Sequence, residues 1–209
     1  MRILRRAQAC VEVIEGATRI VVDPGALGTP VDLTGATAVL VTHDHVDHAD
    51  HDLLARARQR DPDLRTLGPA PLAAALDPPI ETVAEGDELA IGPVPVRVVG
   101  RLQEPGSLHE GEVANVGYVL GGRVLHPGDA YQDVPDIEVA LLPMQGPWVR
   151  RTEQERWLES HRPRRMVGIH AVLLNDEGRA FARKSPEEMA RAVGAESTWL
   201  DEGEELDLG

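Results

Sequence analysis

The chain has 209 residues, of which 42% are hydrophobic and 27% are charged with both signs present, so a disordered or fibrous protein is excluded and one globular domain over residues 1–209 is expected. Its net charge of -14 opposes attraction to nucleic acid and to anionic membranes. Cys10 is the only cysteine, which excludes an intrachain disulfide. Because the sequence shows neither a signal-peptide hydrophobic region nor an apolar run of roughly 18 residues, a cytoplasmic protein without a membrane span is expected.

Short β-branched runs dominate the first half of the chain. Residues 10–14 and 18–22 are two such runs, and the turn Glu15-Gly16-Ala17 between them predicts a hairpin. Residues 37–42 form a continuous apolar strand, and the pattern over residues 52–60 predicts a helix. The other elements predicted here are strands over residues 64–67, 80–83, 88–91 and 94–99 and a short helix over residues 71–76.

The second half repeats this alternation. Residues 115–120 and 122–125, joined by Gly121-Gly122, predict a second hairpin that leads into His126-Pro127-Gly128-Asp129. The elements predicted after it are strands over residues 137–142, 165–169, 198–200 and 205–208 and helices over residues 152–161 and near residues 186–192. Strands interleaved with helices predict mixed sheets with helices outside them, and we find no linker or sequence repeat.

A histidine-rich run follows directly on the strand over residues 37–42. It consists of His43-Asp44-His45-Val46-Asp47-His48. In extended backbone the side chains at positions i and i+2 point to the same side, so His43, His45 and Asp47 can converge while a bend turns His48 inward. Imidazole and carboxylate ligands are typical of catalytic zinc and of related transition metals. The run therefore predicts a metal site, and the alternative is a solvated histidine-rich turn.

This run resembles the signature of the metallo-β-lactamase superfamily. Three further segments resemble superfamily motifs in the same order along the chain, namely Val22-Asp23-Pro24-Gly25, His126-Pro127-Gly128-Asp129 and Ile169-His170. The short length and the pair Gly117-Tyr118 resemble the small lactonase-like members related to L-ascorbate-6-phosphate lactonase. The resemblance implies an α+β fold, an αββα four-layer sandwich with the metal site at one edge of its two sheets.

The resemblance also implies a two-metal site. The metal ligands that it implies are His43, His45, Asp47, His48, His109, Asp129 and His170. The first ion would bind the first two histidines of the run and a third histidine, the second ion would bind Asp47, His48 and His170, and Asp129 would bridge both. Asp23 would orient a ligand histidine. The implied cofactors are two divalent ions, zinc in the first place, with manganese or iron as alternatives.

The third histidine of the first metal position is assigned by its place in the chain. His109 is the only histidine between His51 and His126, and it lies shortly before the strand over residues 115–120. The alternative is that His109 belongs to a surface loop. Small members of the superfamily often carry a histidine nearer the preceding strand end, where this chain has Gln103, and in that case the first metal position is weakened.

Several other residues could serve the site or its surroundings. Structural or surface roles are expected for the remaining histidines, His51, His126 and His161. Trp148 lies beyond the strand over residues 137–142, where loops shape pockets, and is predicted either to contact the substrate or to anchor its own loop. Candidate partners for an anionic substrate group are Arg101, Arg150 and Arg151.

The ligand set predicts a metal-dependent hydrolase in which a metal-bridged hydroxide attacks a small ester, lactone or phosphoester, with Asp47 and Asp129 as catalytic carboxylates. A phosphodiesterase or nuclease of the same superfamily is an alternative that the acidic charge disfavours. A redox di-iron member is also disfavoured, because such members commonly have glutamate where this chain has His45. A non-catalytic metal-binding protein that retains the fold is the remaining alternative. The expected partner is a small-molecule substrate, and the sequence leaves the oligomeric state open.

Overall fold

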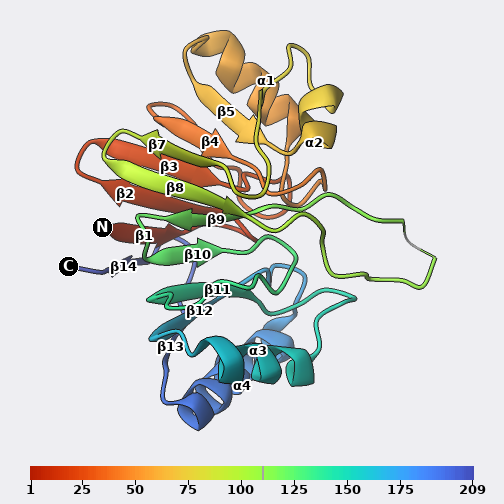
Figure 1. Cartoon of the computed structure of the whole chain (residues 1–209), viewed down its shortest axis with the longest axis vertical. Helices are drawn as coiled ribbons and strands as arrows, with labels where there is room; N and C mark the ends of the chain where they lie inside the picture. Colours follow the sequence, from red (N-terminus) through yellow and green to blue (C-terminus); the bar gives the residue numbers. More distant parts are fainter. Residues whose placement is uncertain (110) are drawn as a thin grey trace.

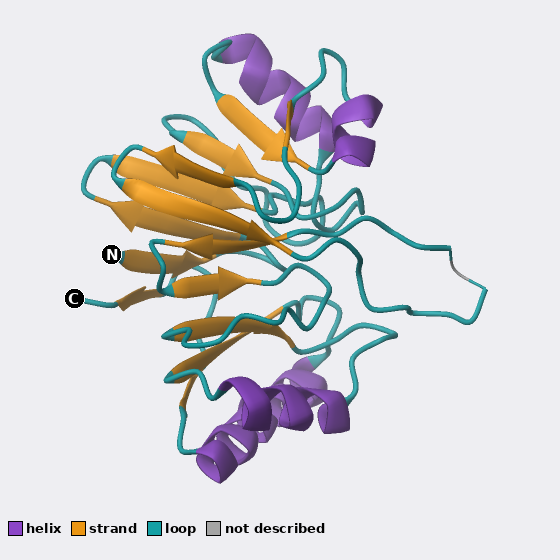
Figure 2. Cartoon of the chain, viewed as in Figure 1, coloured by secondary structure: helices purple, strands orange, loops and turns teal. Residues whose placement is uncertain are grey.

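Four layers of secondary structure make up the protein. The computed structural model describes residues 1–109 and 111–209. Two seven-stranded sheets pack together, with α1 (His51–Arg60) and α2 (Ala70–Ala75) outside the first and α3 (Arg151–His161) and α4 (Asp176–Val193) outside the second (Figure 1). Figure 2 shows the helices as the two outer layers and the strands between them. The predicted αββα sandwich is confirmed.

The first sheet joins antiparallel and parallel strands. Its spatial order is β14 (Glu205–Asp207), β1 (Arg2–Arg5), β2 (Val11–Glu15), β3 (Thr18–Val22), β4 (Ala38–Leu40), β5 (Arg65–Gly68) and β6 (Glu81–Thr82). β2 and β3 pair antiparallel with Val13 opposite Ile20, which confirms the predicted hairpin. β3 to β6 run parallel. β1 was not predicted, because its basic residues obscure the apolar pattern of a strand. The strand is held by pairing with β2 on one side and β14 on the other.

The second sheet brings distant residues to one edge. Its spatial order is β13 (Glu196–Thr198), β12 (Arg165–Ile169), β11 (Val139–Pro143), β10 (Val124–His126), β9 (Gly117–Leu120), β8 (Val94–Val99) and β7 (Glu88–Ile91). β10 to β13 run parallel. Because the carboxyl ends of parallel strands meet at one edge, Asp129 after β10 and His170 after β12 come to the same edge.

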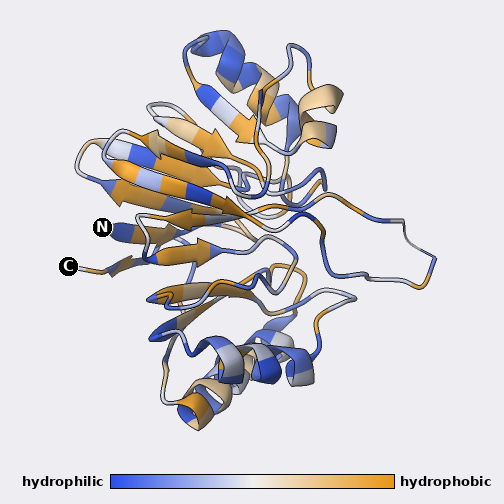
Figure 3. Cartoon of the chain, viewed as in Figure 1, coloured by the Kyte–Doolittle hydropathy of each residue, from blue (hydrophilic) through white to orange (hydrophobic). Residues whose placement is uncertain are grey.

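The core between the sheets is almost entirely aliphatic. It includes Ile20 and Leu40 from the first sheet and Val96 and Leu141 from the second, all fully buried or nearly so. Figure 3 shows the apolar colour concentrated on the strands, whereas α1 is largely hydrophilic. The exception is Tyr118 on β9, one of the largest fully buried side chains. Its hydroxyl donates a hydrogen bond of 2.8 Å to the carbonyl oxygen of Val41, which ties the second sheet to the chain just before His43.

Replacing Tyr118 by phenylalanine is expected to lower the free energy of unfolding by about 1 to 3 kcal/mol, because the buried carbonyl of Val41 loses its hydrogen-bond partner. For a domain of this size the melting temperature should fall by roughly 2–4 °C per kcal/mol. Thermal unfolding of the metal-free proteins measures this difference without a contribution from bound ions. An unchanged melting temperature would show that the bond does not stabilise the fold.

α4 is longer than the sequence predicts. The helix was expected near residues 186–192 but begins at Asp176, so the predicted start was wrong. Asn175 caps it by accepting a hydrogen bond of 2.8 Å from the backbone N–H of Gly178. Gly178 and Pro186 look like helix breakers, but Pro186, Met189 and their buried neighbours pack against the second sheet and this contact outweighs the local preference. In the part of the chain that the structure describes, no helix is both long and apolar enough to cross a membrane.

Candidate metal centre

The histidine-rich run forms a tight turn after β4, not the extended segment that the sequence predicts. The backbone N–H groups of His48 and Ala49 both bond the carbonyl oxygen of His45, at 2.9 and 2.8 Å. The Asp-Pro-Gly segment packs against this turn so closely that a Cβ atom at Gly25 would collide with the backbone carbonyl of Asp47. The turn reverses the chain, so Asp47 and His48 face the same edge as His43 and His45.

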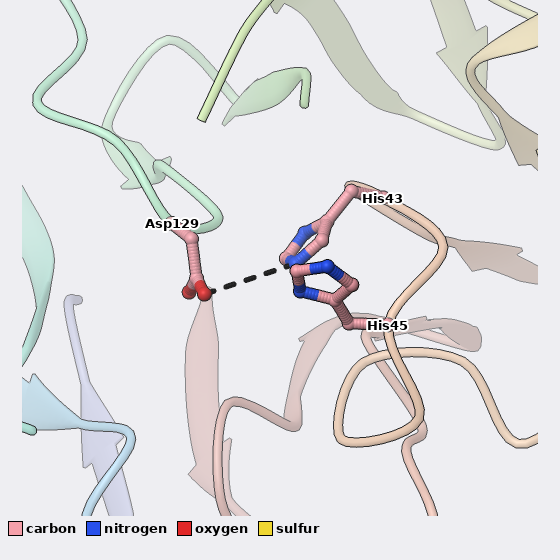
Figure 4. Close-up of side chains that lie close together, drawn as sticks. All are labelled: His43, His45 and Asp129. Carbon is pink, nitrogen blue, oxygen red and sulfur yellow. Dashed lines mark hydrogen bonds and ion pairs between the residues drawn. The ribbon is translucent and has the colours of Figure 1, made fainter. Parts of the chain in front are cut away.

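Six of the seven predicted ligands come together in two groups. The groups are His43, His45 and Asp129, and Asp47, His48 and His170. Within each group the candidate ligand atoms all lie within 4.8 Å of one another. Figure 4 shows the first group, in which the rings of His43 and His45, from one segment, face the carboxylate of Asp129, from another. Each group offers the nitrogen and oxygen ligands that divalent transition metals prefer.

Asp129 lies between the two groups. Its Oδ2 is 3.7 Å from Nε2 of His43, while its Oδ1 is 3.2 Å from Nε2 of His48 and 3.5 Å from Nε2 of His170. The side-chain oxygen of Asn115 accepts a 3.0 Å hydrogen bond from the backbone N–H of Asp129, which fixes the loop after β10. One carboxylate thus presents one oxygen to each group, the arrangement that a bridging ligand needs.

Asp23 holds one of the ligand histidines from behind. Its Oδ1 accepts a 2.7 Å hydrogen bond from the backbone N–H of Thr42, and its Oδ2 accepts one of 2.7 Å from the Thr42 hydroxyl. The same Oδ2 lies 2.7 Å from Nδ1 of His48, and Asp23 is fully buried. With Nδ1 held, Nε2 of His48 is turned toward Asp129. The candidate ligand that Asp23 orients is therefore His48.

The charges of the cluster are strongly coupled. Burial alone raises the pKa of Asp129, but the charge and the hydrogen bond of His48, with smaller electrostatic contributions from neighbouring histidines, outweigh it and hold that pKa below its usual value. Burial lowers the pKa of His48, but Asp129 and Asp23 outweigh it and raise that pKa well above its usual value. Burial and the neighbouring His48 lower the pKa of His43 to about 3. A proton on His48 balances the carboxylates, and a cation can replace it.

The residues fit bound metal. Nε2 of His48 and Oδ1 of Asp129 are buried and make no hydrogen bond of good geometry, although they lie 3.2 Å apart. Buried polar atoms in this state are costly unless a ligand satisfies them. Both atoms belong to the candidate ligand groups, so a divalent cation that they coordinate would remove this cost.

His109 is not brought to either group. The segment between β8 and β9 pairs with itself, since the N–H of Gln103 bonds the carbonyl of Val113 at 3.0 Å and Leu102 pairs with Ala114. The described parts of this segment project away from the sheets (Figure 1), and His109 is exposed near their end. Its role as a ligand stays a prediction. Two histidines and one carboxylate already make up a three-ligand set of the kind found in catalytic zinc sites.

The other residues that the sequence singles out lie outside the two ligand groups. Trp148 is only 7% exposed and meets the ring of Tyr131 edge to face, with the centroids 5.7 Å apart. Both rings and Arg150 line a cavity of about 410 Å³, so Trp148 anchors its loop and also forms a cavity wall. The remaining histidines bond or stack elsewhere, as expected: His51 with Asp44, His126 with the carbonyl of Ala9, and His161 with Trp157.

Gln8 is a site residue that the sequence did not reveal. It is 1% exposed and adopts a positive φ of 51° in the turn between β1 and β2. Its Oε1 accepts a 3.0 Å hydrogen bond from the N–H of Val172, which turns its amide nitrogen toward the cluster. That nitrogen donates to Oδ2 of Asp47 at 3.0 Å and lies 3.1 Å from Nε2 of His170. The only sequence signal is an amide flanked by two alanines, which does not point to a metal centre.

Replacing Gln8 by alanine is expected to weaken metal binding in the group of Asp47, His48 and His170 by about 10- to 100-fold, because one ligand carboxylate loses its supporting donor. Titration of the metal-free protein with zinc against a competing chelator should show one weakened site. The matched control is Gln154→Ala, since Gln154 is also buried but its amide donates to the carbonyl of Pro143, outside both groups. Equal loss of affinity in the two variants would contradict this role.

The chain is similar to known proteins in both sequence and fold. The family model described as a beta-lactamase superfamily domain matches residues 6–170. A UPF0173 metal-dependent hydrolase of Thermus thermophilus is 30% identical, with 96% of each chain covered. Protein Rv0786c of Mycobacterium tuberculosis is 29% identical over 87% of this chain and 89% of its own length. The crystal structure of the metallo-β-lactamase fold protein YhfI from Bacillus subtilis matches with a TM-score of 0.71 at 18% identity, over 96% of this chain and 91% of that one.

Proposed function

Because the chain belongs to the β-lactamase superfamily, we propose that it is a metal-dependent hydrolase that cleaves a small ester, lactone or phosphoester with two divalent ions, zinc in the first place. The observation that carries the proposal is the position of Asp129, whose two oxygens face one ligand group each. A single structural metal would not require a carboxylate between two separate groups. The lactonase-like subtype remains part of the proposal.

The chain's own residues have separable tasks in this proposal. His43, His45 and Asp129 hold one ion, and Asp47, His48 and His170 hold the other. When bound, such ions supply a water of lowered pKa and polarise the substrate oxygen. The pKa values of Asp47 and Asp129 are both held below the usual value, for Asp47 because hydrogen bonds from His170 and Gln8 and the charge of His48 outweigh its burial. Both carboxylates are therefore anionic at neutral pH and act as ligands, not as proton donors.

The proposed partner is a small molecule, and the proposed location is the cytoplasm. The net charge of -14 opposes the electrostatic attraction on which nucleic-acid binding depends. A nuclease or phosphodiesterase of the superfamily is therefore the weaker alternative. The exposure of His109 favours a second candidate, a non-catalytic protein that retains the fold and binds metal.

Metal analysis and activity on the same preparation test the proposal. The purified chain is stripped of metal, reconstituted with zinc, manganese or iron(II), and assayed on lactones, carboxylic esters, thioesters, phosphodiesters and phosphomonoesters. Two equivalents of metal and metal-dependent hydrolysis of at least one class are expected. One equivalent of metal or none, together with no hydrolysis of any substrate tested, would favour the non-catalytic candidate.

A further inference from the structure

A buried arginine lies near the metal centre without an acidic partner. Arg5 ends β1, and because it stands two positions after Ile3, both side chains point to the face that packs on the second sheet. Arg5 is only 6% exposed, its Nη1 contacts the carbonyl oxygen of Arg6, and its Nε has no hydrogen-bond partner in the described chain. Among residues 1–109 and 111–209, no carboxylate forms an ion pair with it. A buried charge in this state is costly, and a bound ion of opposite sign would compensate it.

The charge of Arg5 persists at neutral pH. Burial lowers the pKa of Arg5 to about 10, and the negative charges of Glu202 and Asp201 offset burial only in part. Because this pKa still lies well above 7, the guanidinium group keeps its proton. Loss of the proton therefore does not relieve the cost of burying the charge.

Arg5 lines a cavity of about 60 Å³ that adjoins the second ligand group. The other walls of this cavity include Gln8 and Ala171. Gln8 donates a hydrogen bond to Asp47, and Ala171 directly follows His170. One water molecule needs roughly 10–15 Å³ of a cavity, so this one holds an ion of about four or five non-hydrogen atoms. That is the size of one carboxylate or phosphate group.

A second arginine lines the same cavity. Arg179 belongs to α4, and its Nε and Nη2 donate hydrogen bonds to the carbonyl oxygens of Leu174 and Val172, at 3.1 and 3.4 Å. These bonds hold the guanidinium group at the cavity, and within the described residues Arg179 makes no ion pair. A guanidinium group has more N–H donors than these bonds use, in a planar arrangement that matches the oxygens of carboxylate and phosphate. Arg5 and Arg179 together therefore offer several donors to an oxyanion.

Two carboxylates also line the cavity, but one of them is already engaged. Asp201 pairs with Arg183, whereas Glu202 is exposed and makes no ion pair in the part of the chain that the structure describes. The third arginine of the cavity, Arg6, pairs with Glu12 at 2.7 Å. The unengaged charges at the cavity are thus two guanidinium groups and one carboxylate, a positive balance in a chain whose net charge is -14.

We propose that this cavity, which lies between β1, α4 and the segment that follows β12, binds a small oxyanion such as phosphate between Arg5 and Arg179. The anion compensates the buried charge of Arg5. Gln8 connects the cavity to the metal centre, because its Oε1 accepts a hydrogen bond from the N–H of Val172 and its Nε2 donates one to Asp47. A bound anion therefore stabilises the segments that position Gln8. Anion binding here does not depend on hydrolysis at the metal centre.

Titration with inorganic phosphate tests the site. Phosphate is added to the metal-free full chain at constant ionic strength, because it would also bind zinc, and binding is measured by isothermal titration calorimetry and by the rise in melting temperature. One saturable site is expected, and its Kd should rise at least about tenfold in Arg5→Met and in Arg179→Gln, since each variant loses hydrogen bonds to a charged group. Glu202→Gln should lower the Kd by about two- to threefold, because a like charge is removed. The matched control is Arg191→Gln, an exposed arginine of α4 outside the cavity, which should leave the Kd unchanged.

The source of the anion is distinguished with glycerol 3-phosphate. Binding of inorganic phosphate alone would indicate a free ion, and binding of both would indicate an anionic group carried by a larger ligand. Arg179 is exposed, so Arg179→Gln keeps the test valid if Arg5→Met does not fold. No saturable binding of phosphate, or binding to Arg179→Gln with wild-type affinity, would overturn the proposal. The second result would assign the anion to the protonated histidines of the metal-free cluster.

Discussion

The Asp129→Ala variant is expected to lose both metal ions and hydrolysis together. Asp129 is the one ligand that faces both groups, with an oxygen 3.7 Å from His43 and the other 3.2 Å from His48. Its removal leaves two histidines in the first group, fewer than the three protein ligands of a catalytic zinc site. We expect kcat/KM to fall by at least about a thousandfold, since bound metal contributes several kcal/mol to transition-state stabilisation.

The matched control is Asp133→Ala. Asp133 lies in the same loop but is exposed, and its ion pair with His161 at the surface contributes little to stability. Elemental analysis after reconstitution with zinc and the rate on the best substrate of the panel are compared for both variants. Two equivalents of zinc in Asp129→Ala would show that this carboxylate does not bridge. Full zinc with lost activity would assign it to the reaction and not to metal binding.

The ligands that adjoin strands could be predicted from the sequence. His43 to His48 form a compact run after an apolar strand, so four candidate ligands stand within six residues. Asp129 and His170 each follow a predicted strand, and strands that run parallel in one sheet bring their following residues to one edge. The order of the motifs along the chain was therefore enough to predict most of the candidate site and the four-layer fold.

The residues that depend on loops could not be predicted. His109 was assigned by its position in the chain, but the backbone pairing of Gln103 with Val113 carries that segment outward, and this pairing has no pattern in the sequence. Gln8 reaches the site only because a positive φ in a short turn aims its amide at Asp47. In both cases the outcome depends on backbone geometry between elements, which hydrophobic periodicity does not describe.

The loop that carries Trp148 shows the same division. Trp148 was predicted to contact substrate or to anchor its loop, and its contact with Tyr131 on the wall of a cavity is compatible with both roles. The contacts of a loop residue of this kind depend on which other loops lie next to it in the folded protein, so they become visible only in the structure.

The Asp23→Ala variant is expected to show the largest loss of stability. Asp23 is fully buried and accepts from the N–H and the hydroxyl of Thr42 while it lies 2.7 Å from Nδ1 of His48. Breaking a buried ion pair by removing one partner costs about 3–5 kcal/mol. Urea unfolding of the metal-free protein measures this loss, and zinc affinity should fall by about 10- to 100-fold because the His48 ring is no longer oriented. A loss below about 1 kcal/mol would contradict a buried interaction of this kind.

The Asp23→Asn variant separates orientation from charge. An asparagine keeps one oxygen to accept from the N–H of Thr42, so it should retain more of the stability than alanine does. Its amide group would donate to Nδ1 of His48, which places the imidazole proton on Nε2, the atom turned toward Asp129. Because a metal needs that nitrogen unprotonated, Asp23→Asn should bind zinc as weakly as Asp23→Ala despite its greater stability. Zinc affinity that followed stability across the two variants would instead mean that Asp23 acts only through the fold.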